Sequence, residues 1–203
     1  MQAEPLSARP GSAFEGSSYE VPQLLTPRVF GDERGFFFES WNQLTFSQAL
    51  GLSIEQVPAF VQDNHSRSVQ GVLRGLHYQL APHAQVKLVR CVVGGIFDVA
   101  VDLRRSSASF GQWAGAVLSA DNKQQLWVPE GFAHGFLTLS QDAEVLYKTT
   151  DFWSKDCERV IRWDDPQLAI TWPSLGVSTG RQLSEKDALG PLLANCAAGD
   201  LFL

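Results

Sequence analysis

The chain has few of the residues that bind transition metals or form disulfides. It contains four histidines and three cysteines, and none of them stand in a His-x-His, His-Glu-x-x-His or Cys-x-x-Cys spacing. A metal site would have to be assembled from single residues scattered along the chain, so we expect no metal. An odd number of cysteines without paired spacing is typical of a protein kept in a reducing compartment.

The sequence also lacks a long apolar run and an excess of basic residues. No stretch approaches the roughly 18 apolar residues of a membrane-spanning helix, and the N-terminus shows no secretory signal. The net charge of -6 disfavours nucleic acid or an anionic membrane as a partner. We therefore expect a cytoplasmic protein that binds neither nucleic acid nor membranes. A small anionic ligand stays compatible, because it needs only a few local cations.

Length and composition indicate one globular domain. A chain of 203 residues, 44% hydrophobic and 19% charged, is long enough for one sizeable core. The first eighteen residues are rich in Ser, Ala, Pro and Gly and show no periodicity. Such a composition predicts a flexible N-terminal tail over residues 1–18 and a single domain over residues 19–203.

Beyond the tail, short apolar segments alternate with turn residues. Residues 96–103 alternate, with Phe97 and Val99 on one face and Asp98 on the other, as in a strand with two different faces. Gly94 and Gly95 predict a two-residue hairpin turn before this strand. Short strands at this spacing are typical of an all-β sandwich or jelly-roll barrel. The expected strands cover residues 26–30, 36–40, 85–93, 96–103, 113–118, 124–128, 136–139 and 143–149.

Two short helices are expected to flank the strands. Residues 42–51 form the stronger candidate, because they end at a glycine that can adopt the left-handed C-cap conformation. Residues 183–193 are compatible with one or two helical turns after an irregular stretch. The predicted fold is therefore all-β with short flanking helices.

Residues 74–79 (RGLHYQ) and 85–90 (QVKLVR) carry most of the chemical information. They place His77 near the cations Arg74 and Lys87 in strand-like sequence. A histidine moves protons near neutral pH, and cations beside it favour an anionic substrate or a negative charge that develops during reaction. This combination suits removal of a proton next to a carbonyl group on a phosphorylated molecule.

Each of these residues also has a structural interpretation. His77 could be a polar strand residue with a satisfied ring, unless a bulge at Gly75 turns it and Arg74 toward one cavity. His134, in a corner bounded by glycines, could bind a ligand or hold the corner by hydrogen bonds. Tyr147 could pack in the core.

The cations of the 85–90 strand leave three possibilities open. Lys87 and Arg90 lie among Val, Leu and Cys residues, where an unpaired charge is costly. Each could face solvent, pair with Asp98 or Asp102, or serve the function of the protein.

Eight segments in the same order give the chain a resemblance to the dTDP-4-dehydrorhamnose 3,5-epimerase family. The resemblance extends from residue 26 to residue 193, and no single segment carries it alone. The segments are residues 32–39 (DERGFFFE), 60–66 (FVQDNHS), 74–79 (RGLHYQ), 85–90 (QVKLVR), 97–102 (FDVAVD), 129–136 (PEGFAHGF), 147–148 (YK) and 183–187 (LSEKD).

The resemblance implies a cupin-type jelly-roll barrel, a homodimer, and catalysis without a metal or another cofactor. It implies that the substrate is dTDP-4-dehydro-6-deoxy-D-glucose, inverted at carbons 3 and 5 to dTDP-4-dehydro-L-rhamnose. In such dimers the segment around Arg34 and Glu39 can reach the site of the partner subunit.

The resemblance also implies roles for individual residues. His77 corresponds to the general base, Tyr147 to the general acid, Asp187 to the carboxylate that orients the base, and Lys87 to the cation beside the 4-keto oxygen. The implied substrate-binding residues are Arg34, Glu39, Gln62, Asn64, Arg74, His134, Glu158 and Lys186.

The chain departs from the family pattern after Tyr147. Where the family often has a second tyrosine, residues 151–153 read DFW. Trp153 can still stack on thymine or line the sugar pocket, although a hydroxyl contact is lost. A single-site epimerase of a related dTDP-sugar, and a jelly roll that only binds nucleotide sugars, are therefore alternatives. A metal-dependent cupin is disfavoured by the missing His-x-His pair.

Overall fold

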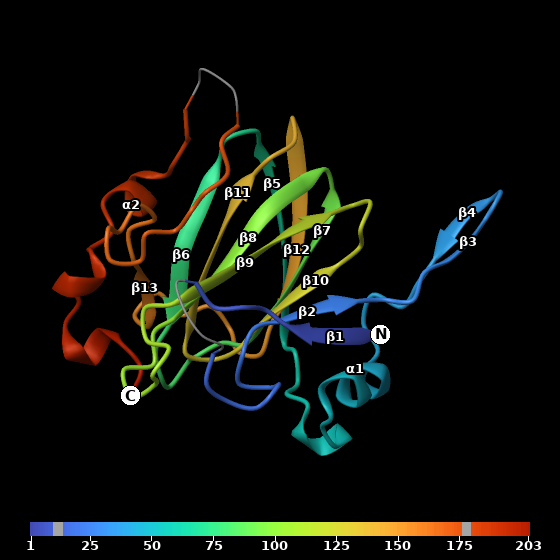
Figure 1. Ribbon diagram of the computed structural model, residues 1–203, viewed down its shortest axis with the longest axis horizontal. Helices are drawn as coiled ribbons and strands as arrows, with labels where there is room; N and C mark the ends of the chain where they lie inside the picture. Colours follow the sequence, from blue (N-terminus) through green and yellow to red (C-terminus); the bar gives the residue numbers. More distant parts are fainter. Residues whose placement is uncertain (10–13, 176–179) are drawn as a thin grey trace.

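Two antiparallel sheets face each other in the computed structural model, which describes residues 1–9, 14–175 and 180–203 (Figure 1). The first sheet contains, in spatial order, β1 (Gln2–Pro5), β2 (Gln23–Thr26), β10 (Gln125–Val128), β7 (Lys87–Val93), β12 (Asp142–Thr149) and β5 (Gln62–Val69). The second contains β13 (Glu158–Val160), β6 (Leu73–Gln79), β11 (Phe132–Thr138), β8 (Gly95–Asp102) and β9 (Trp113–Ser119). The fold is a jelly-roll barrel, as the strand pattern predicts.

Along each strand, every second side chain points inward, and these side chains fill the space between the two sheets. Val89 and Val145 of the first sheet meet Ile96 and Phe136 of the second in one buried cluster. Residues of opposite parity, such as Leu88 of β7 and Val99 of β8, turn to the outer faces. Both outer faces are apolar as well, so each must be covered by other parts of the chain.

A short helix covers the outer face of the first sheet. Helix α1 (Gln43–Leu50) begins at Asn42, whose side chain accepts hydrogen bonds from two backbone N–H groups, and ends at Gly51 with φ of 70°. Phe46 is fully buried, with its ring centroid 5.0 Å from that of Trp127. The helix predicted over residues 42–51 is confirmed. A turn of 3₁₀ helix (Ile54–Gln56) follows it.

The C-terminal segment covers the outer face of the second sheet. Leu168, Trp172 and Leu193 pack on the outward side chains of β6, β8 and β11. This segment contains α2 (Glu185–Ala188) and two 3₁₀ turns, Leu193–Asn195 and Ala198–Asp200. The predicted short helical turns over residues 183–193 are thus present, and they lie against β6.

The predicted hairpin at Gly94 and Gly95 is wrong. Strand β7 belongs to the first sheet and β8 to the second, so the turn carries the chain from one sheet to the other. Gly94 has φ of 67°, and a Cβ atom there would lie 2.1 Å from the Asp142 carbonyl oxygen. A glycine pair specifies a tight reversal, but not the sheet to which the next strand belongs.

The prediction of a flexible tail over residues 1–18 disagrees with the structure of residues 1–9 and 14, while residues 10–13 lie outside the described residues. Residues 2–5 form β1, which pairs with β2, and Arg9 forms a bridge with Trp113. Ala8 and Phe14 are buried, with the Phe14 ring packed edge-on against Phe132 at 5.4 Å. These contacts join distant parts of the chain, and isolated apolar residues among Ser, Pro and Gly give no periodic signal for them.

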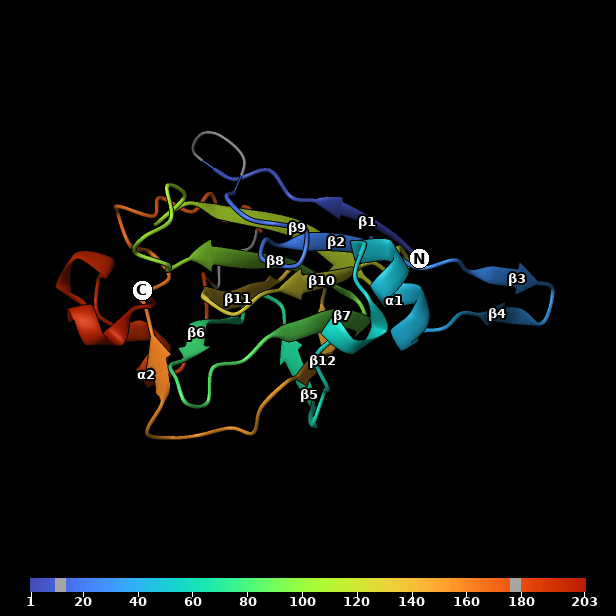
Figure 2. The same cartoon turned by 90° about the horizontal axis from the view of Figure 1, so that it is seen from below.

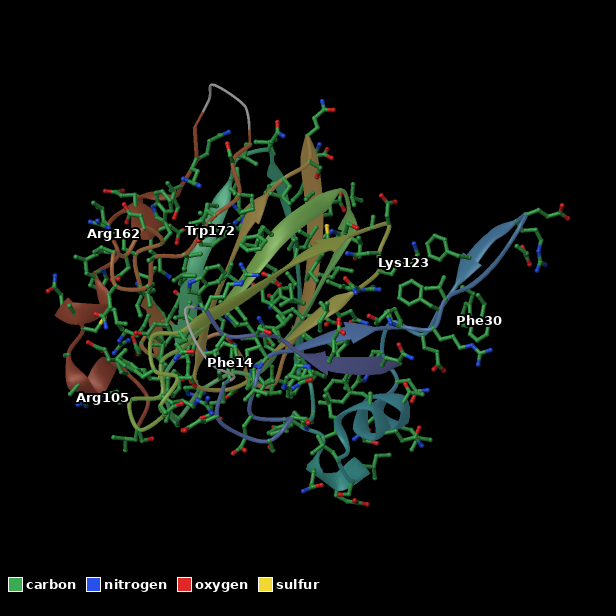
Figure 3. The ribbon with its side chains drawn as sticks, viewed as in Figure 1. Phe14, Phe30, Arg105, Lys123, Arg162 and Trp172 are labelled. Atoms are coloured by element: carbon green, nitrogen blue, oxygen red, sulfur yellow. The ribbon has the colours of Figure 1, made fainter. Side chains whose placement is uncertain are left out.

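A third, two-stranded element projects from the barrel. Strands β3 (Phe30–Asp32) and β4 (Gly35–Phe37) pair only with each other and extend away from both sheets (Figure 1, Figure 2). Phe30, Phe36 and Phe37 of this hairpin are 51%, 63% and 68% exposed. Figure 3 shows the contrast between Phe30 on the projecting hairpin and Phe14 within the body of the protein. A strand–turn–strand is present as predicted, but its strands cover residues 30–32 and 35–37 instead of 26–30 and 36–40, and its aromatic residues do not join the core of this chain.

In the part of the chain that the structure describes, no helix has the length and apolar character needed to cross a membrane.

We expect Phe14→Ala to lower the free energy of unfolding by about 3 kcal/mol, because the change leaves a cavity against Phe132. Denaturant unfolding at fixed protein concentration measures the change. Leu44→Ala, at an exposed position of α1, is the matched control and should change stability by no more than about 0.5 kcal/mol. Equal stabilities of Phe14→Ala and the wild-type protein would show that the N-terminal segment does not contribute to the core.

Candidate active site

A polar cavity of about 120 Å³ opens between the two sheets at one end of the barrel. Side chains from β5, β6, β7 and β12 and from the segment after β12 surround it. The residues that line it are Gln62, Asn64, His77, Tyr78, Gln79, Gln85, Lys87, Tyr147, Trp153 and Glu158.

An irregularity in β6 turns His77 toward the cavity. His77 pairs with His134 of β11, and Arg74 pairs with Phe136, so three steps along β6 match two along β11. This bulge brings both predicted residues to the inward side, as the hypothesis about Gly75 requires. Gly75 has φ of +120°, and a Cβ atom there would lie 2.6 Å from Gly135 Cα. Only glycine fits, because the backbones of the two strands nearly touch.

The ring of His77 is bound to a buried carboxylate. Its Nε2 lies 2.5 Å from Oδ1 of Asp187, which is 3% exposed and belongs to α2. Burial by itself would raise the pKa of Asp187, but the hydrogen bond and charge of His77 outweigh burial and lower this pKa. An ionised carboxylate can only accept hydrogen bonds, so the proton of the neutral ring lies on Nε2. The lone pair of Nδ1 is then free to take a proton.

Lys87 supplies a buried positive charge beside this histidine. The side chain points inward from β7, is 7% exposed, and its Nζ donates to the His77 carbonyl oxygen at 3.3 Å. Burial lowers the pKa of Lys87 to about 8, and the negative charges of Asp98 and Glu158 partly oppose this change. Arg90, three residues further along the strand, has the opposite parity and does not line the cavity. The two cations of this strand thus have different environments.

Tyr147 faces the cavity from the opposite sheet. It lies on β12 between Asn64 of β5 and Val89 of β7. Burial raises the pKa of its hydroxyl, and the nearby charge of Arg74 opposes that rise. The phenol therefore holds its proton at neutral pH and can donate it. Tyr147 also packs against the central core, as the structural interpretation of this residue requires.

His134 forms a second histidine–carboxylate pair next to the cavity. Its Nε2 lies 2.6 Å from Oδ1 of Asp98 of β8, and both side chains are buried. His134 does not line the cavity, and the hydrogen bond supports the interpretation that it holds the corner together. Asp98 is thus hydrogen-bonded to His134. Its negative charge also raises the pKa of Lys87 more than that of Glu158 does.

The remaining predicted residues divide into those close to the cavity and those far from it. Glu158 lines the cavity and forms an ion pair with Lys186 at 2.5 Å. Arg74 reaches from β6 across to β5, where its Nε donates to Ser68 Oγ at 3.0 Å. Trp153 lies in the cavity wall with 57% of its surface exposed.

Neither Arg34 nor Glu39 lines the cavity of its own chain. Arg34 is at the tip of the β3–β4 hairpin, paired with Asp32, and Glu39 accepts a hydrogen bond from Asn42. The hairpin points away from the barrel (Figure 1). Within one chain the structure does not bring these two residues to the site.

Sequence reasoning missed Gln79 and Gln85 as site residues. Both line the cavity, and Gln79 is 3% exposed. The signal for Gln79 was present, because it stands two residues after His77 and shares its face of β6. Gln85 precedes β7 in an irregular segment, where no periodicity in the sequence indicates which way its side chain points.

Among the described residues, no three or more His, Cys, Asp or Glu side chains are grouped closely enough to hold a metal ion.

Comparison with known proteins points to one family. The model of the dTDP-4-dehydrorhamnose 3,5-epimerase family matches residues 20–195. A dTDP-4-dehydrorhamnose 3,5-epimerase of Shigella flexneri is 59% identical over 173 residues, covering 84% of this chain and 91% of that protein.

Solved structures extend the likeness to three dimensions. A dTDP-6-deoxy-D-glucose-3,5-epimerase of Legionella pneumophila, in complex with dTDP-4-keto-L-rhamnose, has a TM-score of 0.84 and 43% identity, covering 99% of this chain and 98% of that one. A more distant structure is a 3'-monoepimerase of Streptomyces bikiniensis in complex with dTDP-quinovose, with a TM-score of 0.76 and 31% identity, covering 85% and 84% of the two chains. Since the match extends over both sheets and the cavity between them, the chain belongs to the dTDP-4-dehydrorhamnose 3,5-epimerase family.

Proposed function

We propose that this protein inverts dTDP-4-dehydro-6-deoxy-D-glucose at carbons 3 and 5, which yields dTDP-4-dehydro-L-rhamnose for dTDP-L-rhamnose biosynthesis. One observation carries the proposal. A histidine oriented by a carboxylate, a buried lysine and a protonated tyrosine surround a single cavity, with the histidine and the tyrosine on opposite sheets.

The first step is removal of a proton from a carbon next to the 4-keto group. His77 Nδ1 takes the proton, and the electron pair of the C–H bond moves to the ketone oxygen to form an enolate. The imidazolium that results is stabilised by Asp187, which holds the ring from the other side. Lys87 faces the same cavity and stabilises the enolate oxygen, as the donors of an oxyanion hole do.

Inversion needs a second proton from the opposite face of the sugar. Tyr147 supports this role because it extends from β12 of the first sheet, whereas His77 extends from β6 of the second. The tyrosine gives its proton to the carbon and the enolate returns to the ketone. Exchange with solvent then restores the proton of Tyr147 and removes that of His77. His77 and Tyr147 can act on both carbon 3 and carbon 5, since both carbons are next to the 4-keto group.

Polar residues around the cavity suit the rest of the ligand. Gln62 and Asn64 are hydrogen-bonded to each other at 2.9 Å on the wall of the cavity and can bind sugar hydroxyl groups. Arg74 and Lys186 lie beside the cavity and can neutralise the diphosphate.

A single-site epimerase is the second candidate, because Trp153 replaces a tyrosine of the family and a 3'-monoepimerase shares the fold. The higher identity to a 3,5-epimerase favours inversion of both carbons. Proton NMR of the reaction in deuterated water separates the two, since each inverted carbon takes up one deuterium. Deuterium at one carbon only would establish the single-site reaction.

The assigned roles predict different results for two variants. Tyr147→Phe should still exchange substrate hydrogen with solvent faster than it inverts configuration, because the enolate can be reprotonated from the side of His77. His77→Asn should lose both exchange and inversion, by at least about 10²–10⁴-fold. Deuterium uptake and product configuration, followed by NMR, measure both quantities. Loss of exchange and inversion in strict proportion in Tyr147→Phe would refute a separate second-face acid.

The pKa of Lys87 predicts an alkaline limit to activity. Because the pKa is lowered to about 8, the cation is present below this pH and is lost above it. We therefore expect kcat/KM to fall as the pH rises through about 8, since kcat/KM reports the free enzyme. Lys87→Arg keeps its charge and should move this limit to higher pH, even if its maximal rate is lower. An unmoved limit would assign the titration to another group.

We also propose that the protein forms a homodimer in which each β3–β4 hairpin enters the site of the partner. The hairpin exposes three phenylalanines and carries Arg34 away from its own cavity. Strand β5, which carries Gln62 and Asn64, is the edge of the first sheet and has a free side. An exposed edge and an exposed apolar hairpin both favour pairing with another chain.

Mixing two variants tests this arrangement. Arg34→Ala and His77→Asn should each be nearly inactive, but a mixed dimer contains one complete site. After unfolding and refolding an equal mixture, half of the dimers are mixed, so activity should recover to about a quarter of that of the wild-type protein. Refolded single variants are the controls. No recovery in the mixture would show that Arg34 acts in its own chain, and an active Arg34→Ala control would show that it is not needed at all.

A further inference from the structure

Residues 151–154, between β12 and β13, place Trp153 in the cavity wall, and three glutamine side chains bind the backbone of these four residues. We call them the wall segment. Gln85 binds the carbonyl of Asp151, Gln79 binds Phe152 and Ser154, and Gln62 binds Trp153. Every residue of this wall segment thus has a backbone group held by a glutamine side chain.

Gln79 makes two of these four contacts and a third hydrogen bond to His83. Its Nε2 donates to the carbonyl oxygens of Phe152 at 3.1 Å and His83 at 2.6 Å, and its Oε1 accepts from the N–H of Ser154 at 2.8 Å. Both amide hydrogens are used, so the side chain has no donor left for a ligand. The planar amide therefore fixes the wall segment relative to β6, the strand that carries His77.

The other two glutamines hold the segment from different directions. Gln85 Nε2 donates to the Asp151 carbonyl oxygen at 2.8 Å, and Gln62 Oε1 accepts from the N–H of Trp153 at 3.2 Å. Gln85 precedes β7 and Gln62 begins β5. Contacts from three separate elements restrain both the position and the orientation of the segment.

The position of Trp153 depends on these backbone hydrogen bonds, because the packing of its own ring does not fix it. The side chain is 57% exposed, so most of the indole has no packing that would fix its position. The backbone hydrogen bonds determine where the ring can lie.

We propose that Gln79 and Gln85 are positioning residues, which act on the substrate through Trp153. The proposal rests on the proposed function: the preorganised indole face stacks on a planar or ring-shaped part of the dTDP-sugar. Preorganisation of a wall residue lowers the entropy that binding must overcome. Gln79 then affects substrate affinity without touching the substrate.

Gln79→Leu removes the amide while keeping a similar volume. We expect KM for the dTDP-sugar, and the dissociation constant of dTDP measured by calorimetry, to rise about 10-fold, with kcat changed much less. Amide hydrogen exchange should accelerate at Ser154 and Trp153. Gln70→Leu is the matched control, because Gln70 also donates to a backbone carbonyl, that of Leu139, but does not line the cavity. The control should leave KM and the exchange of residues 151–154 unchanged.

A double variant separates positioning from a general loss of structure. In Trp153→Ala the ring is absent, so adding Gln79→Leu should raise KM little further. Additive effects, or unchanged exchange at Ser154 in Gln79→Leu, would overturn the proposal. If Gln79→Leu fails to fold, Gln85→Leu, which loses a single contact to the segment, should show a smaller rise of KM with the same dependence on Trp153.

The two proposals fail in different ways. If the wild-type protein does not epimerise the dTDP-sugar, the proposed function is wrong, yet hydrogen exchange and dTDP binding still test the glutamine contacts. If the wild-type protein is active and these measurements do not change in Gln79→Leu, only the positioning role is wrong.

Discussion

The hydrogen bond between His77 and Asp187 joins residues that are 110 positions apart, and much of the fold serves to form it. One partner lies on a strand of the second sheet and the other on a helix of four residues. So short a helix has no stability of its own. It is placed by the C-terminal segment, which folds over the outer face of the second sheet and buries Trp172 and Leu193 there. Apolar burial on the outside of the barrel thus fixes the orientation of an imidazole on its inside.

The charged groups inside the barrel also depend on a small number of polar contacts. Lys87 is buried beside a carbonyl oxygen and near Asp98, which is itself hydrogen-bonded to His134. A buried charge is tolerated only when it has partners, and here one carboxylate serves two basic groups. The cavity therefore keeps a cation that is weakly compensated. An enolate oxygen would supply the missing negative charge.

The local features of the fold could be predicted from the sequence. Helix α1 shows its N-cap and its terminal glycine, β8 shows strict alternation, and the ordered motifs identify His77 and Tyr147 as site residues. The signals for the helix and the strand lie within about ten neighbouring residues, where propensity and periodicity operate. The motifs identify the site residues only through their order along the chain and the resemblance to a family.

Features that depend on long-range contacts could not be predicted. The turn at Gly94 looks the same whether the next strand joins its own sheet or the opposite one. The N-terminal segment gains its order from Phe132 and β2, which nothing in residues 1–18 indicates. The contacts of Gln79 are equally hidden, because a glutamine has no periodic preference and its partners are backbone groups of a distant loop.

The close approach of β6 and β11 at Gly75 and Gly135 has a consequence for how such a site can diversify. Any side chain larger than hydrogen at Gly75 would collide with the neighbouring strand, so the strand that carries His77 is closed to substitution there. Residues 151–154 are held by amide contacts to their backbone, which do not depend on the side chains at these positions. The side chains of this loop can therefore vary while the strands that carry His77 and Lys87 stay in place.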